Sequence, residues 1–227
     1  MWYKHTQLPS ACHLCQWTGI IFMQVQQWIH WRWIWMPSWY SKVLFCIDLS
    51  GNYVIDPDGN GGLAPFTVFC DMAGKNGVGV TVISHDSESR TLVQGCARKG
   101  CHSRDIRYTG ASLSQLASLT SISSHCEQFI KYECHNSVLL YNNNPYGWWV
   151  SRNSAKMTYW GGASVSGKCA CGMTNSCANP SYGCNCDKND NVWRKDSGLL
   201  TDKAHLPVKQ LRFGDTGSHE QGYHTLG

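Results

Sequence analysis

The sequence is poor in charged residues, which make up only 15% of its 227 positions, against about 25% in a typical soluble domain. The 19 Lys and Arg against 15 Asp and Glu give a net charge of +4, too small and too dispersed to indicate a nucleic-acid-binding protein. Aromatic residues reach 12%, so the chain has enough apolar surface to fold, which argues against disorder. Its length fits one ordinary domain or two small ones.

Signatures of catalysis and of membrane insertion are also lacking. There is no Gly-x-Ser-x-Gly elbow, no His-Glu-x-x-His helix and no glycine-rich loop that leads into a helix. The contiguous triplet Ser84, His85 and Asp86 is no sign of a triad, because triad members meet in space rather than along the chain. No window offers the ~18 uninterrupted apolar residues that a membrane span needs. We therefore expect neither an enzyme nor a membrane span within this chain.

Acidic residues are absent from positions 1–47, which hold seven of the eleven Trp and only one of the 22 Gly. All 15 Asp and Glu follow from Asp48 onward. Two such different compositions indicate two origins. We interpret 1–47 as a Trp-rich leader that is not homologous to the rest, either disordered or an artefact of the gene model, and 48–227 as the domain.

The domain shows patterns that favour strands. Residues 52–56 and 65–70 alternate and flank a loop rich in Pro, Gly and Asp, which predicts a hairpin, and the β-branched stretch 78–84 predicts a third strand. Residues 112–119 predict a helix, because Ser112 and Gln115 form a capping-box pattern ahead of leucines on one face. Further strands are predicted at 126–134, 137–140, 147–151 and 157–160, with a last one at 206–213.

Ten cysteines follow the first strand pair, and we predict that they form disulfides: Cys70, Cys96, Cys101, Cys126, Cys134, Cys169, Cys171, Cys177, Cys184 and Cys186. Zinc sites usually use Cys-x2-Cys pairs, whereas this loop has Cys-x-Cys pairs, so zinc fits poorly. Cys96 with Cys101, and Cys126 with Cys134, are spaced for short links. The pattern indicates an oxidising compartment. The irregular stretch 161–191 holds five cysteines, so one must pair outside it or lack its partner.

Several short motifs, in order, resemble a known family. Residues 50–59 (SGNYVIDPDG) and 65–72 (PFTVFCDM) look like the opening of a fibrinogen C-terminal-like domain. The motifs at 126–128 (CEQ), 148–150 (WWV), 159–162 (YWGG), 168–172 (KCACG), 184–187 (CNCD), 193–196 (WRKD) and 205–208 (HLPV) narrow the resemblance. Together they are similar to the divergent module of contactin-associated proteins and neurexin-like adhesion receptors, over about 48–227.

The resemblance implies an α+β fold, with a twisted, mostly antiparallel sheet, short helices and a disulfide-rich irregular loop region. It implies a non-enzymatic recognition module of the cell-adhesion type, either secreted or in the ectodomain of a membrane protein. Its partners would be extracellular or cell-surface proteins. The family places a further Cys shortly beyond the stretch that ends here at Gly227. We therefore expect a C-terminally truncated domain, and the missing Cys would explain the odd number in the loop.

The resemblance also suggests a ligand site. Many fibrinogen-like domains bind calcium through an Asp-rich loop, and the nearest candidates are Asp187 and Asp190; the alternative is a polar loop that solvates itself. An adjacent aromatic pocket would bind carbohydrate or acetylated ligands. Its candidate lining is Trp148, Trp149, Tyr159 and Trp160, which alternatively form core strands. A calcium-dependent lectin is thus the alternative function, and an intracellular zinc protein is a third.

Overall fold

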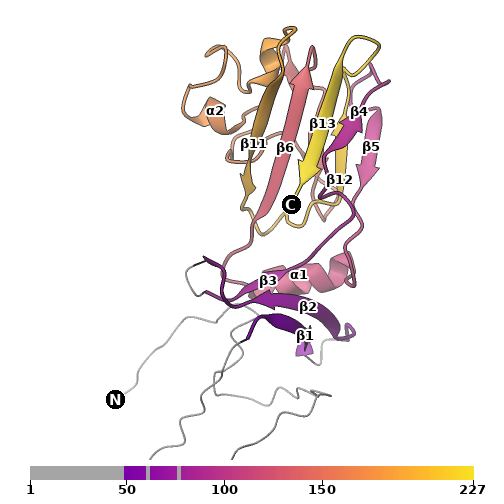
Figure 1. Cartoon of the computed structure of the whole chain (residues 1–227), viewed down its shortest axis with the longest axis vertical. Helices are drawn as coiled ribbons and strands as arrows, with labels where there is room; N and C mark the ends of the chain where they lie inside the picture. The colour runs from indigo at the N-terminus through magenta and orange to yellow at the C-terminus, as the bar shows by residue number, and fades with distance from the viewer. Residues whose placement is uncertain (1–48, 60–61, 76–77) are drawn as a thin grey trace, which may run out of the picture.

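The computed structural model describes residues 49–59, 62–75 and 78–227. The prediction for the leader 1–47 lies outside these residues. The described chain forms two parts along the long axis of the molecule: a small sheet with one helix at one end, and a larger region of paired sheets at the other (Figure 1). We call them the small region and the large region.

The small region contains the predicted hairpin and helix, and both are confirmed. Its sheet has the order β1-β2-β3 and is antiparallel, with Gly51 opposite Cys70; the bounds are β1 Gly51–Ile55, β2 Phe66–Asp71 and β3 Val80–Val82. Helix α1 (Leu113–Ile122) begins after the N-cap Ser112, whose capping box with Gln115 is present. A small aliphatic core joins helix and sheet, formed by Ile55, Phe66, Val68, Cys70, Leu116 and Leu119.

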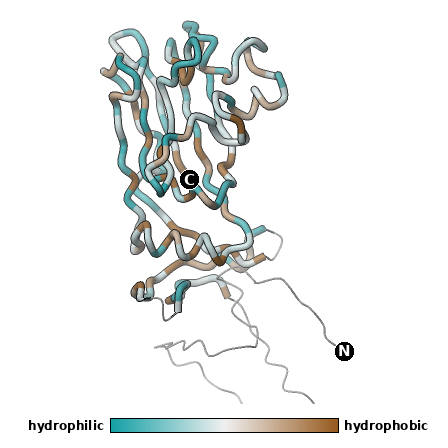
Figure 2. The backbone as a smooth tube through the Cα atoms, turned by 180° about the vertical axis from the view of Figure 1, so that it is seen from behind, coloured by the Kyte–Doolittle hydropathy of each residue, from teal (hydrophilic) through white to brown (hydrophobic). Residues whose placement is uncertain are grey.

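The large region has two antiparallel four-stranded sheets, with orders β11-β6-β13-β4 and β10-β9-β12-β5. Their bounds are β4 Thr91–Val93, β5 His102–Asp105, β6 Gln128–His135, β9 Trp148–Val150, β10 Lys156–Met157, β11 Arg194–Leu200, β12 Gln210–Phe213 and β13 Gln221–Leu226; a short pair, β7 Leu140–Tyr141 and β8 Asn144–Pro145, stands apart. Hydrophobic and hydrophilic stretches are intermixed along the backbone of this region (Figure 2). The described chain thus has four antiparallel sheets rather than one.

An aromatic core joins the two large sheets. Tyr132 of β6 stacks on Phe213 of β12 with ring centroids 4.6 Å apart, and Trp160 stacks on both rings. Trp149 of β9 is fully buried in the same cluster. Gly222 of β13 makes room for this arrangement, because a Cβ there would stand 2.4 Å from the Tyr132 hydroxyl.

The strand predictions for the large region need correction. Strand β12 occupies only the second half of the predicted 206–213, and it is not the last strand, because β13 follows. Strands β11 and β13 were missed, as were the short strands β4, β5 and β8. In β11 and β13 the buried positions include Leu200 and Leu226, but also Asp196, Gly222 and His224, which interrupt the hydrophobic alternation. A period-two pattern read from hydrophobicity cannot detect such strands.

Two short strand predictions are largely wrong. In 137–140 only Leu140 belongs to a strand, because carboxylates rather than a neighbouring strand accept the backbone N–H groups of Val138, Leu139 and Leu140. In the predicted strand 157–160 only Met157 belongs to a strand, β10.

A candidate recognition site at the disulfide-bonded end

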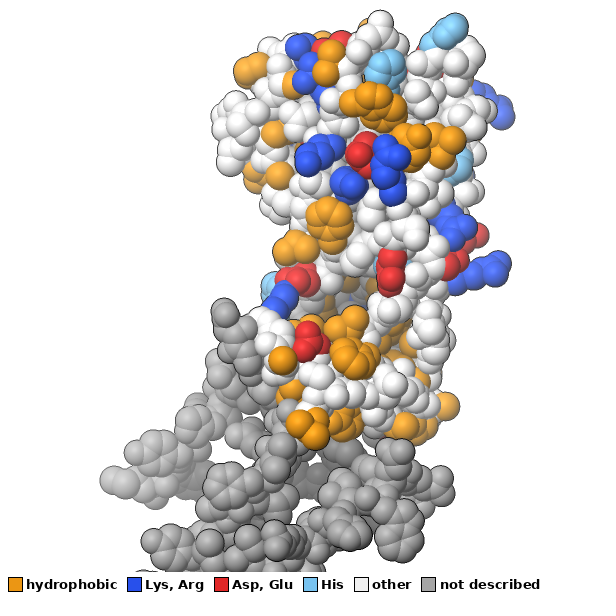
Figure 3. Space-filling model, in the orientation of Figure 1, with side chains coloured by type: hydrophobic (Ala, Val, Ile, Leu, Met, Phe, Trp, Pro, Cys, Tyr) orange, Lys and Arg blue, Asp and Glu red, His pale blue; other side chains and the backbone are white. Residues whose placement is uncertain are grey.

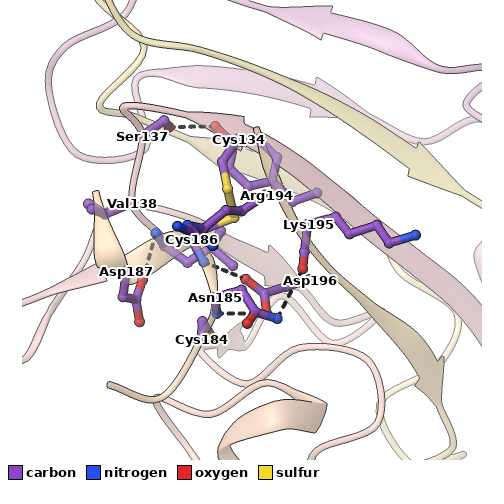
Figure 4. Close-up of a disulfide and its surroundings, with 12 residues drawn as sticks. Cys134, Ser137, Val138, Cys184, Asn185, Cys186, Asp187, Arg194, Lys195 and Asp196 are labelled. Atoms are coloured by element: carbon purple, nitrogen blue, oxygen red, sulfur yellow. Dashed lines mark hydrogen bonds between the residues drawn. A yellow bond between two sulfur atoms is a disulfide. The ribbon is translucent and has the colours of Figure 1, made fainter. Parts of the chain in front are cut away.

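The irregular loop 161–191 is held by three disulfides. It contains two short elements, α2 (Ala170–Met173) and the 3-10 turn η3 (Cys186–Lys188). Two links close within the loop, Cys169–Cys184 and Cys171–Cys177, and the third joins Cys186 to Cys134 of β6 (Figure 4). All five loop cysteines are therefore bonded. The expectation that one pairs outside the loop is confirmed, and the explanation by a missing cysteine is wrong.

The predictions for the other described cysteines have three different outcomes. The predicted link Cys96–Cys101 is present. The suggested link between Cys126 and Cys134 is wrong, because Cys134 is bonded to Cys186. Within the described ranges Cys126 carries a free, half-buried thiol, and burial raises its pKa. Cys70 is buried in the small core, and its disulfide stays a prediction.

A buried carboxylate fastens the loop to β11. Asp196 accepts hydrogen bonds from the backbone N–H groups of Asn185 and Cys186, both at 2.9 Å, and from the Asn185 side chain at 3.1 Å (Figure 4). Burial raises the pKa of Asp196, and these donors offset part of that shift. The loop is therefore anchored by hydrogen bonds and a disulfide at neighbouring residues. The sequence places Asp196 in the motif 193–196 but gives no indication of this anchoring role.

The two proposed calcium ligands have different environments. Asp187 is buried and accepts hydrogen bonds from the backbone N–H groups of Leu139 and Leu140 at 3.1 and 2.8 Å. Burial raises its pKa to about 7. Asp190 instead forms a two-point ion pair with Arg194, at 2.9 and 2.7 Å, beside Lys188 at 3.4 Å. Both carboxylates therefore already hold the loop together.

Three of the four aromatic residues predicted to line a pocket, Trp149, Tyr159 and Trp160, lie in or against the core, whereas Trp148 is half-buried next to Trp149 on β9. Trp149 and Trp160 are 0% and 1% exposed, so they offer no surface to a ligand. The indole N–H of Trp149 donates to the backbone carbonyl of Tyr159 at 2.7 Å. Tyr159 packs partly buried against the core, and Lys156 lies 3.7 Å above the ring of Trp148. The burial of Trp149, Tyr159 and Trp160 fits the core alternative, and the ligand role of Trp148 stays a prediction.

Among the described residues, one group has potential ligand atoms close enough together to hold a metal ion. The ligand atoms of Cys169, Cys184 and Asp196 lie within 4.8 Å of one another. The two sulfurs form a disulfide and the carboxylate accepts three hydrogen bonds, so this group fits a metal poorly. No helix in the part of the chain that the structure describes is long and apolar enough to cross a bilayer.

The loop 161–191, which we call the stapled loop because disulfides hold it, carries large hydrophobic side chains on its surface. Val165, Met173 and Tyr182 are each between 43% and 46% exposed. Met173 and Tyr182 lie within the segment that the Cys169–Cys184 link closes, and Val165 lies four residues before it. Exposed aromatic and Met side chains on a restrained backbone are typical of protein-contact surfaces, because little entropy is lost when they bind.

Sequence comparisons relate the chain to segments of several curated proteins. Contactin-associated protein 1 of Rattus norvegicus is 44% identical over 170 residues, which is 74% of this chain and 12% of that protein, and the Homo sapiens protein is 43% identical over the same length. Neurexin-4 of Drosophila melanogaster is 38% identical over 186 residues, 78% of this chain and 14% of that protein. No protein-family profile matches the chain.

These identities establish homology to a segment of each protein. The chain spans only about an eighth of the length of these relatives, so the activity and partners of the whole proteins are not transferred by the match.

Proposed function

We propose that the chain is an extracellular, non-enzymatic recognition module of the cell-adhesion type, which acts through protein–protein contacts. The observation that carries the proposal is the 44% identity to a segment of contactin-associated protein 1, whose name describes association with another protein. Four disulfides among the described residues support an oxidising compartment. We also infer that the fold is of the fibrinogen C-terminal-like kind, from the ordered motifs that lie on β1, β2, β6, β9 and β11.

The contact surface in this proposal is the stapled loop, with Met173 and Tyr182 as its principal side chains. Tyr is among the residues that contribute most at interfaces, and Met packs against irregular partners. Because the disulfides hold the loop in one arrangement, binding does not require the loop to order first.

The proposal is tested with the full chain expressed through a secretory route and applied to intact cells. A free-thiol count by mass spectrometry first checks for the four bonds. We expect binding that is lost when the cells are treated with protease beforehand, and that falls severalfold in a Met173→Ser, Tyr182→Ser double variant.

Val54→Ser is the matched control, because Val54 is 56% exposed but lies on β1 of the small region. It should leave binding unchanged. Free thiols at the eight bonded positions, or binding that survives protease treatment, would overturn the proposal.

A further inference from the structure

The outward face of the sheet β11-β6-β13-β4 lies away from the aromatic core. Figure 1 looks onto this face. Glu133 of β6 stands at its centre, with Lys195 of β11 opposite on one side and Tyr223 of β13 on the other. None of these side chains is buried. The face is therefore a row of polar and aromatic groups open to a ligand.

Positive charge is concentrated on this face. Arg90 lies 3.2 Å from the centroid of the Tyr223 ring and donates to Glu133 at 2.8 Å, and Lys131 lies 3.3 Å from the same carboxylate. Lys195 is a third cation on this face, so three cations surround the single carboxylate of Glu133. At the start of β11, Arg194 is paired with Asp190, which Lys188 also contacts. Residues 48–227 as a whole hold 16 Lys and Arg against 15 Asp and Glu, so positive charge is locally concentrated here. Figure 3 shows blue Lys and Arg side chains gathered around a red carboxylate here.

One of these cations has no carboxylate partner among the described residues. Lys195 is exposed and forms no ion pair with any residue in the described ranges, whereas Arg90, Lys131 and Arg194 each have a carboxylate partner. An exposed ammonium without a partner binds an external anion at little cost, because no internal ion pair has to be broken.

The cations border a hollow with an aromatic wall. Its volume is about 470 Å3, and it is lined by Arg90, Glu133, Asn185, Trp193, Arg194 and Lys195. Trp193 is 47% exposed, and its ring contacts those of His135 and Tyr223 at tilted angles, with centroids 5.3 and 5.7 Å away. The indole is thus held in place by its neighbours while about half of it stays exposed. A hollow of this size falls within the ~300–1,000 Å3 range of sites for small molecules or short chain segments.

We propose that this hollow binds an anionic glycan, a sugar chain that carries sulfate or carboxylate groups. Guanidinium and ammonium groups bind such anions through charge-assisted hydrogen bonds, and the apolar C–H face of a sugar ring packs on an exposed indole. A protein partner would need about 800 Å2 of complementary surface, and the hydrophobic side chains suited to that lie on the stapled loop instead. The site goes beyond the proposed function and rests only on its extracellular location.

The test is titration of the secreted full chain with a size-defined heparin octasaccharide. We expect binding that weakens as NaCl rises, because salt screens exposed charges. Lys195→Ala should raise Kd about tenfold through loss of one charge-assisted contact, and Trp193→Ala should raise it by a similar factor through loss of stacking. Thermal unfolding checks that both variants are folded.

Lys209→Ala is the matched control, because it removes the same charge at the residue before β12, in the other large sheet, and should change Kd by less than twofold. Absence of octasaccharide binding, or an equal loss in Lys209→Ala, would overturn the site. If poly-L-glutamate bound as tightly and Trp193→Ala had no effect, the surface would recognise acidic proteins instead. The Met173→Ser, Tyr182→Ser variant, which tests the proposed function, should still bind the octasaccharide. Failure of the glycan site can therefore be distinguished from failure of the proposed function.

Discussion

The two regions of the molecule are stabilised by different interactions. The small region has an aliphatic core under α1, and its helix begins at a capping box. In the large region the four described disulfides lie between Cys96 and Cys186, and polar side chains such as Asp187, Asp196 and His224 are buried. One region follows from hydrophobic patterning, whereas the other needs cross-links and buried hydrogen bonds.

The difference follows from composition. The loop 161–191 consists largely of Gly, Ser, Asn and Cys, so it cannot bury enough apolar surface to offset the entropy of ordering its backbone. Disulfides reduce that entropy in the unfolded chain, and buried carboxylates satisfy the loop's N–H groups. The loop contributes mainly its cysteines to the core beneath it, which leaves Val165, Met173 and Tyr182 exposed on its surface.

Removing the longest link should have the largest effect on the large region. Cys134 and Cys186 are 52 residues apart, and the loop-closure relation assigns such a link about 4 kcal/mol of unfolding free energy. The Cys134→Ser, Cys186→Ser double variant should lose that amount in urea unfolding. The Cys96→Ser, Cys101→Ser variant is the control, because its separation of five residues corresponds to about 2 kcal/mol. Equal losses in both would contradict the entropic account.

Truncating the buried carboxylate of β11 should cost about 3 kcal/mol, because Asp196→Ala leaves three donors of Asn185 and Cys186 without their acceptor. Asp196→Asn keeps one acceptor oxygen in place and should lose roughly half as much. Urea unfolding monitored by Trp fluorescence measures both. A loss below about 1 kcal/mol in Asp196→Ala would show that the disulfides alone hold the loop.

Acidification should destabilise the large region through His224. This residue is fully buried, with both ring nitrogens lacking a hydrogen-bond partner, and burial lowers its pKa from 6.5 to about 4. Between these values the unfolded chain takes up a proton that the folded chain does not. The unfolding free energy therefore decreases as the pH is lowered, and at pH 5 it is about 2 kcal/mol smaller than at pH 7.

Asp187 acts in the opposite direction, because its raised pKa of about 7 favours the folded state as the pH falls. We therefore compare native protein with His224→Phe, in which Asp187 is unchanged. Between pH 7 and pH 5 the variant should lose about 2 kcal/mol less than the native protein. His219→Phe, at an exposed position between β12 and β13, should behave as native. Identical pH profiles for His224→Phe and native protein would contradict the prediction.

The small region was more predictable from sequence than the large one, for physical reasons. The hairpin and α1 depend on residues close in the chain, and their alternation and capping signals are local. Strands β11 and β13 bury Asp196, Gly222 and His224 beside Leu200 and Leu226, so their inward positions give only a weak hydrophobic signal. The pairing of Cys134 with Cys186 depends on the fold of a segment that separates them by 52 positions, and spacing alone favoured a nearer partner.

The candidate surfaces show the same division. The cysteines of the stapled loop were predicted as disulfides, since clustered Cys in a Gly-rich segment indicates cross-linking. The face around Lys195 and Trp193 was not predicted, because its members come from β4, β6, β11 and β13 and meet only after the sheet forms. Sequence separation concealed the surplus of positive charge there, which in the composition appears dispersed.

The smallest expected effect, in α1, tests whether the two regions unfold separately. Ser112 accepts a hydrogen bond from the Gln115 N–H at 3.2 Å, and Ser112→Ala should cost about 1 kcal/mol. Hydrogen exchange should then accelerate in α1 and β1–β3 but not in β6. Ser121→Ala is the control, because Ser121 is exposed and its hydroxyl donates only to the Ser118 carbonyl. If β6 exchanged faster to the same extent, both regions would form one cooperative unit, and the disulfides would stabilise the small region as well.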